Sequence, residues 1–252
     1  MSAYDAAADA WADSAAPVYA RFAAAMVDQS PIPLTDATVL DVGAGTAVAC
    51  DAALAAGARR AVATDIAEQM LRRRNPPTEA VVADAARLPF GDGRFDLVMA
   101  GFCLGHLPDP AAALAECRRV GSATLATAFA PGPSHPAKAA VDAAMEELGF
   151  VAPSWYEHLK NDTEPVVEDT ATFEALAVAA GFQNVSISQL TVDTGLRTPA
   201  EIAAWRLGMA QLAPFVASLP PGKRDEARRA AEEAVADIGP VLVDIQVLSA
   251  AA

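Results

Sequence analysis

Short apolar runs and longer amphipathic segments follow one another along most of the chain. The short runs are rich in β-branched residues, as buried strands are. They predict strands over residues 38–42, 61–64, 81–84, 95–100, 123–129, 182–192 and 241–248. Segments between them place apolar residues at spacings of three and four, which predicts helices. Strands that alternate with helices predict an α/β fold with a mostly parallel sheet.

The segment from Tyr4 to Asp28 predicts a helix that Pro17 is expected to break. Its apolar stripe consists of Tyr4, Ala8, Trp11, Ala15, Tyr19, Phe22 and Met26. Two interpretations stay open. The stripe either packs against the core or forms a lid over a bound ligand.

The stretch from Thr38 to Thr46 predicts a buried strand, a glycine turn and the start of a helix over 47–56. Gly43 and Gly45 allow backbone angles, or the close approach of a ligand, that a Cβ would block. We expect the Thr46 side chain to cap the helix. A strand, a glycine turn and a helix form the first half of a nucleotide-binding unit.

The residues around this turn narrow the choice of nucleotide. Val48 stands where a dinucleotide motif has its third small residue. Asp41, just before the turn, favours a cationic ligand over a pyrophosphate. The pattern Asp41-x-Gly43-x-Gly45 resembles the first motif of the class I S-adenosylmethionine-dependent methyltransferases, whose ligand carries an ammonium and a sulfonium.

Later residues extend this resemblance. Asp65 ends the second strand about 20 positions after Gly45, where this topology binds ribose hydroxyls. Asp84 ends the third strand, where the family hydrogen-bonds the adenine amine. The loop 101–110 resembles that of small-molecule methyltransferases of ubiquinone and menaquinone biosynthesis. The resemblance covers roughly residues 36–130, with Ala47 in place of a frequent third glycine.

The resemblance implies a fold, a cofactor and a set of site residues. The fold is a seven-stranded Rossmann-like sheet, mostly parallel with an antiparallel last strand, with helices on both faces and a helical cap. The cofactor is S-adenosyl-L-methionine, with the ring of Tyr19 or Trp11 available for cation–π contact with its sulfonium. The implied cofactor-binding residues are Asp41, Gly43, Ala44, Gly45, Asp65, Ile66, Met70, Asp84, Ala85, Ala100, Phe102 and Tyr19.

The chain divides into four predicted parts. Residues 1–35 form an N-terminal helical lid, and residues 36–130 form the α/β core that binds the cofactor. Residues 131–166 interrupt the α/β alternation and are predicted to be an inserted substrate cap. Residues 167–252 complete the core with C-terminal helices and a strand hairpin.

The predicted reaction is methyl transfer to an O, N or C nucleophile of a small molecule, with a secondary metabolite as the suggested kind of acceptor. His106 and His135 are the candidate general bases, and His158 is a weaker one. For His106 a role in bracing its loop is the favoured alternative. A cyclase or rearrangement catalyst that keeps the cofactor site is an alternative function, and a nucleotide-sensing protein is a third. The residues at the turn disfavour a nicotinamide-dependent dehydrogenase.

Composition limits the partners. The net charge of −14 argues against binding a nucleic-acid backbone or an anionic membrane surface. The three cysteines have no metal-ligand spacing, which favours free thiols in a reducing compartment. The N-terminus lacks signal-peptide features and no apolar run is long enough to span a membrane. We therefore expect a cytoplasmic protein with a small-molecule substrate, and the sequence leaves open whether it is a monomer or a homodimer.

Overall fold

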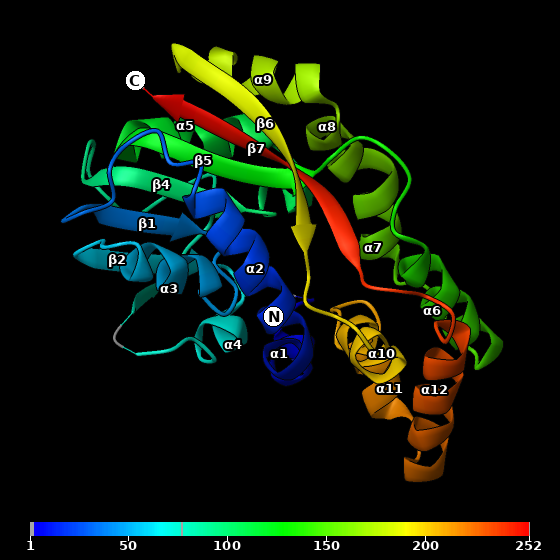
Figure 1. Ribbon diagram of the computed structural model, residues 1–252. Coiled ribbons are helices and arrows are strands. Elements are labelled where there is room, and N and C mark those ends of the chain that lie inside the picture. Colours follow the sequence, from blue (N-terminus) through cyan, green and yellow to red (C-terminus); the bar gives the residue numbers. More distant parts are fainter. Residues whose placement is uncertain (1–2, 77, 252) are drawn as a thin grey trace.

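A computed structural model describes residues 3–76 and 78–251, which form one sheet with helices on both faces (Figure 1). The strand order is β3-β2-β1-β4-β5-β7-β6. The strands are β1 (Thr38–Val42), β2 (Arg60–Asp65), β3 (Glu79–Val82), β4 (Phe95–Gly101), β5 (Gly121–Phe129), β6 (Asn184–Asp193) and β7 (Leu242–Ala251). The predicted seven-stranded sheet is confirmed.

The strand directions also match the prediction. β1 pairs in parallel with both β2 and β4, and the parallel arrangement continues to β3 and β5. β7 is antiparallel to its neighbours β5 and β6. Because the first five strands are parallel, their carboxyl ends meet at one edge of the sheet, which is where such folds bind ligands.

Helical segments lie in the connections between the strands, except in the connection from β3 to β4. The α-helices are α1 (Ala8–Ala10), α2 (Ala16–Val27), α3 (Val48–Ala55), α4 (Glu68–Leu71), α5 (Pro110–Val120), α6 (Pro136–Glu147), α7 (Ser154–His158), α8 (Glu164–Glu168), α9 (Thr170–Ala179), α10 (Pro199–Leu207), α11 (Ala213–Ser218) and α12 (Pro221–Ala234). Short 3-10 and π turns are η1 (Asp5–Ala7), η2 (Trp11–Ala15), η3 (Leu104–His106) and η4 (Leu159–Thr163). None of the helices in the described part of the chain has the length and apolarity that crossing a membrane requires.

Pro17 does not break the N-terminal helix, contrary to the prediction. It stands in the first turn of α2, directly after the π-helical turn η2. A proline in the first turn needs no hydrogen bond from its nitrogen. The wider π turn before it keeps the chain helical from Asp5 to Val27.

Two apolar cores cover the two faces of the sheet. On one face, alternate residues of the strands, such as Val39 and Leu97, pack with α2, α3, α6, α10 and α12. On the other face, Leu40 and Val98 pack with α5 and α9. The alternation between the faces within β1 and β4 follows from the period of two along a strand. The central strands are therefore packed against helices on both faces of the sheet.

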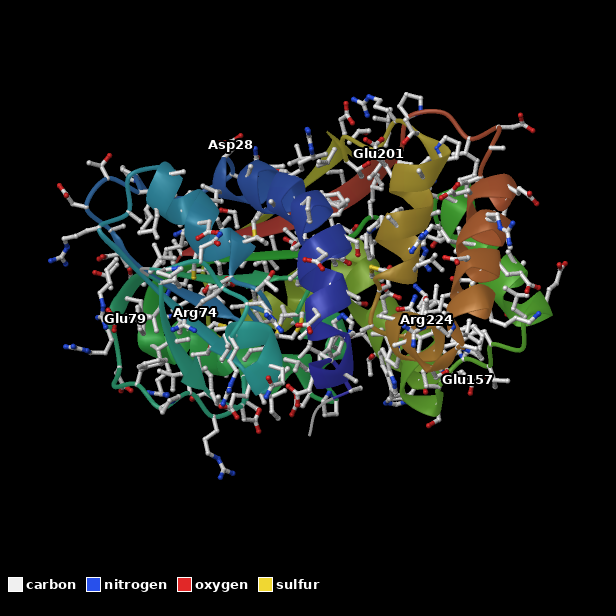
Figure 2. The ribbon with its side chains drawn as sticks, turned by 90° about the horizontal axis from the view of Figure 1, so that it is seen from below. Asp28, Arg74, Glu79, Glu157, Glu201 and Arg224 are labelled. Atoms are coloured by element: carbon white, nitrogen blue, oxygen red, sulfur yellow. The ribbon has the colours of Figure 1, made fainter. Side chains whose placement is uncertain are left out.

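The segment between β6 and β7 differs from a simple hairpin. The two strands pair along their whole lengths, but α10, α11 and α12 lie between them in the chain. These helices group with α6 and α7 beside the sheet, and α2 lies between this group and α3 (Figures 1 and 2). An ion pair from Arg206 of α10 to Asp142 of α6 at 2.9 Å links the two chain segments.

Candidate active site

A cavity of about 290 Å³ opens where β1, β2 and β4 end. Its wall comes from the glycine turn, the residues after β2 and β3, the loop after β4, and the N-terminal helices. The lining residues include Asp41, Gly43, Ala44, Gly45, Asp65, Ile66, Met70, Asp84, Ala85, Phe102 and Tyr19. The structure thus brings together eleven of the twelve predicted cofactor residues at one cavity.

The turn after β1 has a left-handed backbone at three of its residues: φ is +66° at Gly43, +54° at Gly45 and +63° at Ala47. A Cβ on Gly43 would lie 2.3 Å from the Sγ of Cys103, so the position admits glycine only. Ala47 precedes α3 without a side-chain cap, and the Thr46 hydroxyl has no hydrogen-bond partner among the described residues. The prediction that Thr46 caps the helix is therefore wrong.

Asp65 connects the turn to the end of β2. Its Oδ2 accepts a hydrogen bond from the Gly45 backbone N–H at 2.8 Å, and its Oδ1 accepts one from Ala67 at 2.8 Å. Burial raises its pKa, although these two bonds act in the opposite direction. Because a carboxylate oxygen has two acceptor sites, each oxygen can still accept a bond from a ligand.

Asp41 is the most enclosed of the three acids. Asp41 is 2% exposed. The Cys50 thiol of α3 donates a hydrogen bond to the Asp41 Oδ2 at a sulfur–oxygen distance of 3.7 Å. Burial raises the pKa of Asp41 to about 8, and the nearby Asp65 acts in the same direction. A positive charge in the cavity would favour the ionised form, because opposite charges lower the pKa of an acid.

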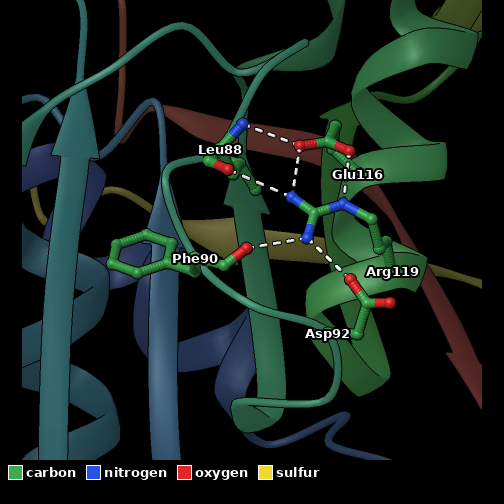
Figure 3. Close-up of polar contacts among 5 residues, drawn as sticks. All are labelled: Leu88, Phe90, Asp92, Glu116 and Arg119. Atoms are coloured by element: carbon green, nitrogen blue, oxygen red, sulfur yellow. Dashed lines mark hydrogen bonds and ion pairs between the residues drawn. The ribbon is translucent and has the colours of Figure 1, made fainter.

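Asp84 lies two residues beyond the end of β3, not in the strand as predicted. Its Oδ1 accepts a hydrogen bond from the Ala86 backbone at 2.9 Å. Arg119 of α5 secures the loop that follows, as Figure 3 shows: it donates to the carbonyls of Leu88 and Phe90 at 3.0 and 2.7 Å. The Arg119 side chain also forms ion pairs with Glu116 and Asp92, so several charged hydrogen bonds hold this loop in place.

The N-terminal helices close the cavity. Tyr4, Trp11 and Tyr19 line it, and the Trp11 and Tyr19 rings lie 4.8 Å apart between centroids. Asp5 accepts a hydrogen bond from the Gln69 backbone at 3.0 Å, and Asp9 forms an ion pair with Arg73. The aromatic stripe therefore both packs against the core and covers the cavity.

The three candidate histidines lie at different places in the structure. His106 lines the cavity, and its Nδ1 lies 2.8 Å from the Tyr4 hydroxyl. Burial lowers its pKa to about 4, so the ring is neutral near pH 7. His135 instead lies at the start of α6, where its ring accepts a hydrogen bond from Ala137, and it lines neither cavity described here. His158 is exposed and pairs with Asp162.

One predicted cofactor residue does not line the cavity. Ala100 is fully buried in the core shared by β4 and α5, on the other face of the sheet. The next residue, Gly101, lines the cavity in its place. The strand is one residue longer than predicted, because it includes Gly101.

Several lining residues were not predicted from the sequence, among them Cys103, Leu107 and Thr127, whereas Met26 belongs to the predicted N-terminal stripe. The Thr127 hydroxyl accepts a hydrogen bond from the Phe102 backbone N–H at 3.1 Å. That bond helps to hold the loop after β4 against β5. The sequence does not show that Cys103 lies at the cavity. Only the folded chain shows that its thiol fills the space beside Gly43.

A second cavity of about 230 Å³ adjoins the first. Tyr4, Trp11, Tyr19 and His106 line both cavities. The remaining wall of the second cavity comes from the segment between β5 and β6 and from α10 and the turn after it. These residues are Phe129, Ser134, Lys138, Ala139, Asp142, Trp155, Tyr156, Leu159, Lys160, Glu164, Trp205, Arg206, Met209, Ala210 and Gln211.

Comparison with known proteins gives matches to one kind of enzyme. A family model described as a methyltransferase domain matches residues 40–123. A demethylmenaquinone methyltransferase of Clavibacter sepedonicus is 34% identical over 178 residues, covering 63% of this chain and 71% of that enzyme. The enzyme of the same name from Renibacterium salmoninarum is 41% identical over 85 residues, covering 32% of this chain and 35% of that enzyme.

A solved structure shares the fold. Phosphoethanolamine N-methyltransferase 2 of Haemonchus contortus, in complex with phosphomonomethylethanolamine and S-adenosylhomocysteine, gives a TM-score of 0.55 at 16% identity. The match covers 91% of this chain and 52% of that one. At this identity the likeness concerns the arrangement of helices and strands.

Proposed function

Because this chain belongs to the class I S-adenosylmethionine-dependent methyltransferases, we propose that it methylates an O, N or C nucleophile of a small molecule. The observation that carries this proposal is the pair of adjoining cavities with a shared aromatic wall. One cavity has the acids and the glycine turn that suit the cofactor. The other is available for the molecule that accepts the methyl group.

The residues of the first cavity fit the cofactor. Gly43 and Gly45 of the turn line this cavity, and a Cβ on Gly45 would lie 3.4 Å from the terminal methyl of Met70, which also lines it. The buried Thr46 hydroxyl has no partner among the described residues. Asp65 has acceptor sites left for two ribose hydroxyls, and Asp84 has one for an adenine amine. Asp41 would face the positive charges of the ligand.

The chain's own contribution is to bind, orient and exclude water. When bound, S-adenosylmethionine supplies an electrophilic methyl group. Tyr4, Trp11 and Tyr19 line both cavities and form the wall that they share. Holding two reactants in line can supply many powers of ten in rate.

We assign His106 a positioning role. Its Nδ1 lies 2.8 Å from the Tyr4 hydroxyl and its pKa is about 4, which makes the neutral imidazole a weak base at neutral pH. It can hold the N-terminal helices over the cavity through Tyr4. His135 lies outside both cavities, which weakens its candidacy as the general base.

The similarity to demethylmenaquinone methyltransferases supports an acceptor of small-molecule size. The three cysteines are free and buried, in keeping with the proposed cytoplasmic location. No observation favours the alternative of a cyclase or rearrangement catalyst.

The test is to incubate the purified protein with S-adenosylmethionine and a library of small aromatic and apolar acceptors. We expect S-adenosylhomocysteine to accumulate together with a product heavier by one methylene. Acceptor conversion to an isomer without S-adenosylhomocysteine would instead support the non-methylating alternative and contradict the proposal.

A further inference from the structure

Three residues that line the second cavity carry buried N–H donors without a hydrogen-bond partner among the described residues. Trp205, Arg206 and Gln211 are 2%, 2% and 5% exposed, and all three line the cavity. Trp205 Nε1, Arg206 Nε and Gln211 Nε2 have no hydrogen-bond partner among the described residues. A buried donor without an acceptor costs free energy, so three of them beside one cavity indicate a ligand that supplies acceptors.

The charges around this cavity do not balance. Arg206 pairs with Asp142 at 2.9 Å, and Lys160 pairs with Glu164. Lys138 remains, and among the described residues no carboxylate lies within ion-pair distance of it. Its Nζ lies 3.8 Å from the centroid of the Phe129 ring, and burial beside Arg206 and Lys160 lowers its pKa to about 8. The cavity therefore holds one cation more than it holds anions.

The rest of the wall is mostly aromatic. Trp11, Tyr19, Phe129, Trp155 and Tyr156 contribute rings to it. Aromatic walls of this kind favour flat or apolar bodies, with a few polar groups that fix orientation. The polar groups here are donors and a cation, and in a chain of net charge −14 that local excess of positive charge is unusual.

We propose that the second cavity binds a small aromatic or apolar monocarboxylate, whose carboxylate is held by Lys138 and by the unpartnered donors of Trp205, Arg206 and Gln211. This proposal rests on the proposed function, because it names the class of molecule that accepts the methyl group. One negative charge matches the single unbalanced cation, whereas a phosphate would bring close to two. Charge-assisted bonds to a carboxylate are the strongest that these donors can form.

The carboxylate is the anchor of the acceptor and not its nucleophile. Lys138, Trp205, Arg206 and Gln211 line only the second cavity, while the wall shared with the first is formed by Tyr4, Trp11, Tyr19 and His106. The anchoring groups and the shared wall are therefore formed by different residues. We expect the bound acid to keep its carboxylate on the anchoring groups, so that the product is not a methyl ester.

The test compares acids with their uncharged amides by titration calorimetry. The probes are benzoate, phenylacetate and indole-3-acetate, each with the matching amide, plus phenyl phosphate. They are titrated into the full chain with and without saturating S-adenosylhomocysteine. We expect at least one acid to bind 10-fold or more tightly than its amide. Equal binding within a pair, binding of no probe, or a preference for phenyl phosphate would overturn the proposal.

Matched variants locate the effect. Lys138→Met keeps the length of the side chain and removes the unbalanced charge, so it is expected to abolish the preference for the acid. Trp205→Phe keeps a ring and removes one donor, and should weaken acid binding several-fold. Lys223→Met, on the exposed surface of α12, is the control and should leave the preference unchanged. An acid preference that survives Lys138→Met in a folded protein would contradict the assignment.

These outcomes separate the two proposals. If S-adenosylhomocysteine does not bind but an acid binds better than its amide, the proposed function fails and the anion site stands. If S-adenosylhomocysteine binds and no acid preference is found, the anion site fails and the methyltransferase proposal stands.

Discussion

The three acids at the rim of the sheet have different surroundings, and this gives them different properties. Asp65 accepts two backbone hydrogen bonds and Asp84 accepts one, whereas Asp41 is enclosed with the thiol and the backbone of Cys50 beside its carboxylate. Desolvation raises the pKa of Asp41 to about 8. The protein without ligand is therefore destabilised when Asp41 ionises, and a positively charged ligand would offset this cost.

Asp41→Asn should stabilise the ligand-free protein more as the pH rises. The pKa of Asp41 is higher in the folded than in the unfolded chain. The contribution of Asp41 to the unfolding free energy of the wild type is therefore fully present at low pH and is lost between about pH 4 and 8. Asparagine has no such dependence. We expect the difference in unfolding free energy between variant and wild type to grow by about 3 kcal/mol from pH 5 to pH 8.

Urea unfolding at a series of pH values measures this difference, and other titrating groups cancel because both proteins share them. Asp28→Asn, at the exposed end of α2, is the control and should give a constant difference. A constant difference for Asp41→Asn as well would show that Asp41 titrates as an ordinary carboxylate.

Individual residues could be predicted from the sequence where one spacing decides their position. Asp65 follows the glycine turn at a fixed distance, and it lies beside Gly45 in the structure. The prediction for Thr46 was wrong because the left-handed backbone at Ala47 removes the capping geometry. No sequence pattern indicates an alanine in that conformation. The donors on Trp205 and Gln211 gain meaning only from burial, which the sequence does not give.

At the scale of elements, the N-terminal helices link the two cavities to the rest of the molecule. Their apolar stripe was visible as a spacing of three and four, but packing and covering a ligand produce the same stripe. The contacts support both interpretations: Asp5 contacts α4 and Asp9 contacts Arg73 just beyond it, while Tyr4 contacts His106. The π turn before Pro17 was not predictable, because it depends on how the helix packs.

Weakening the Tyr4–His106 contact should loosen these helices. Tyr4→Phe removes the hydroxyl at 2.8 Å from the histidine, and His106→Asn removes the ring that it meets. A hydrogen bond within a protein contributes about 1 kcal/mol, so each variant should release S-adenosylhomocysteine about fivefold faster in stopped-flow experiments. The double variant should be no faster than either single one, because both changes remove the same contact.

The control for this experiment is Tyr156→Phe, which removes a hydroxyl from the second cavity alone. Its release rate should equal that of the wild type. The effects of the single changes should also be constant from pH 6 to 9, since His106 stays neutral in that range. Single effects that add in the double variant would mean that Tyr4 and His106 act separately.

For the whole molecule, the sequence predicted the sheet better than the helices around it. Seven strands and the antiparallel last one follow from alternating patterns and from the resemblance, and the structure confirms them. The grouping of α6 with α10 and α12 could not be predicted, because those segments lie on either side of β6 in the chain. That grouping brings Lys138 and Arg206 to one cavity, so the proposed acceptor site depends on tertiary packing alone.

The proposed function depends most on the cavity at the ends of β1, β2 and β4, which we propose binds an adenosyl ligand through Asp65. The most direct measurement is titration calorimetry of the purified chain with S-adenosylmethionine and, separately, with NAD. We predict binding of S-adenosylmethionine only, weakened about 100-fold by Asp65→Ala and unchanged by Glu68→Ala, a nearby exposed carboxylate. Binding of NAD in its place, or equal affinity in the Asp65→Ala protein, would contradict the account.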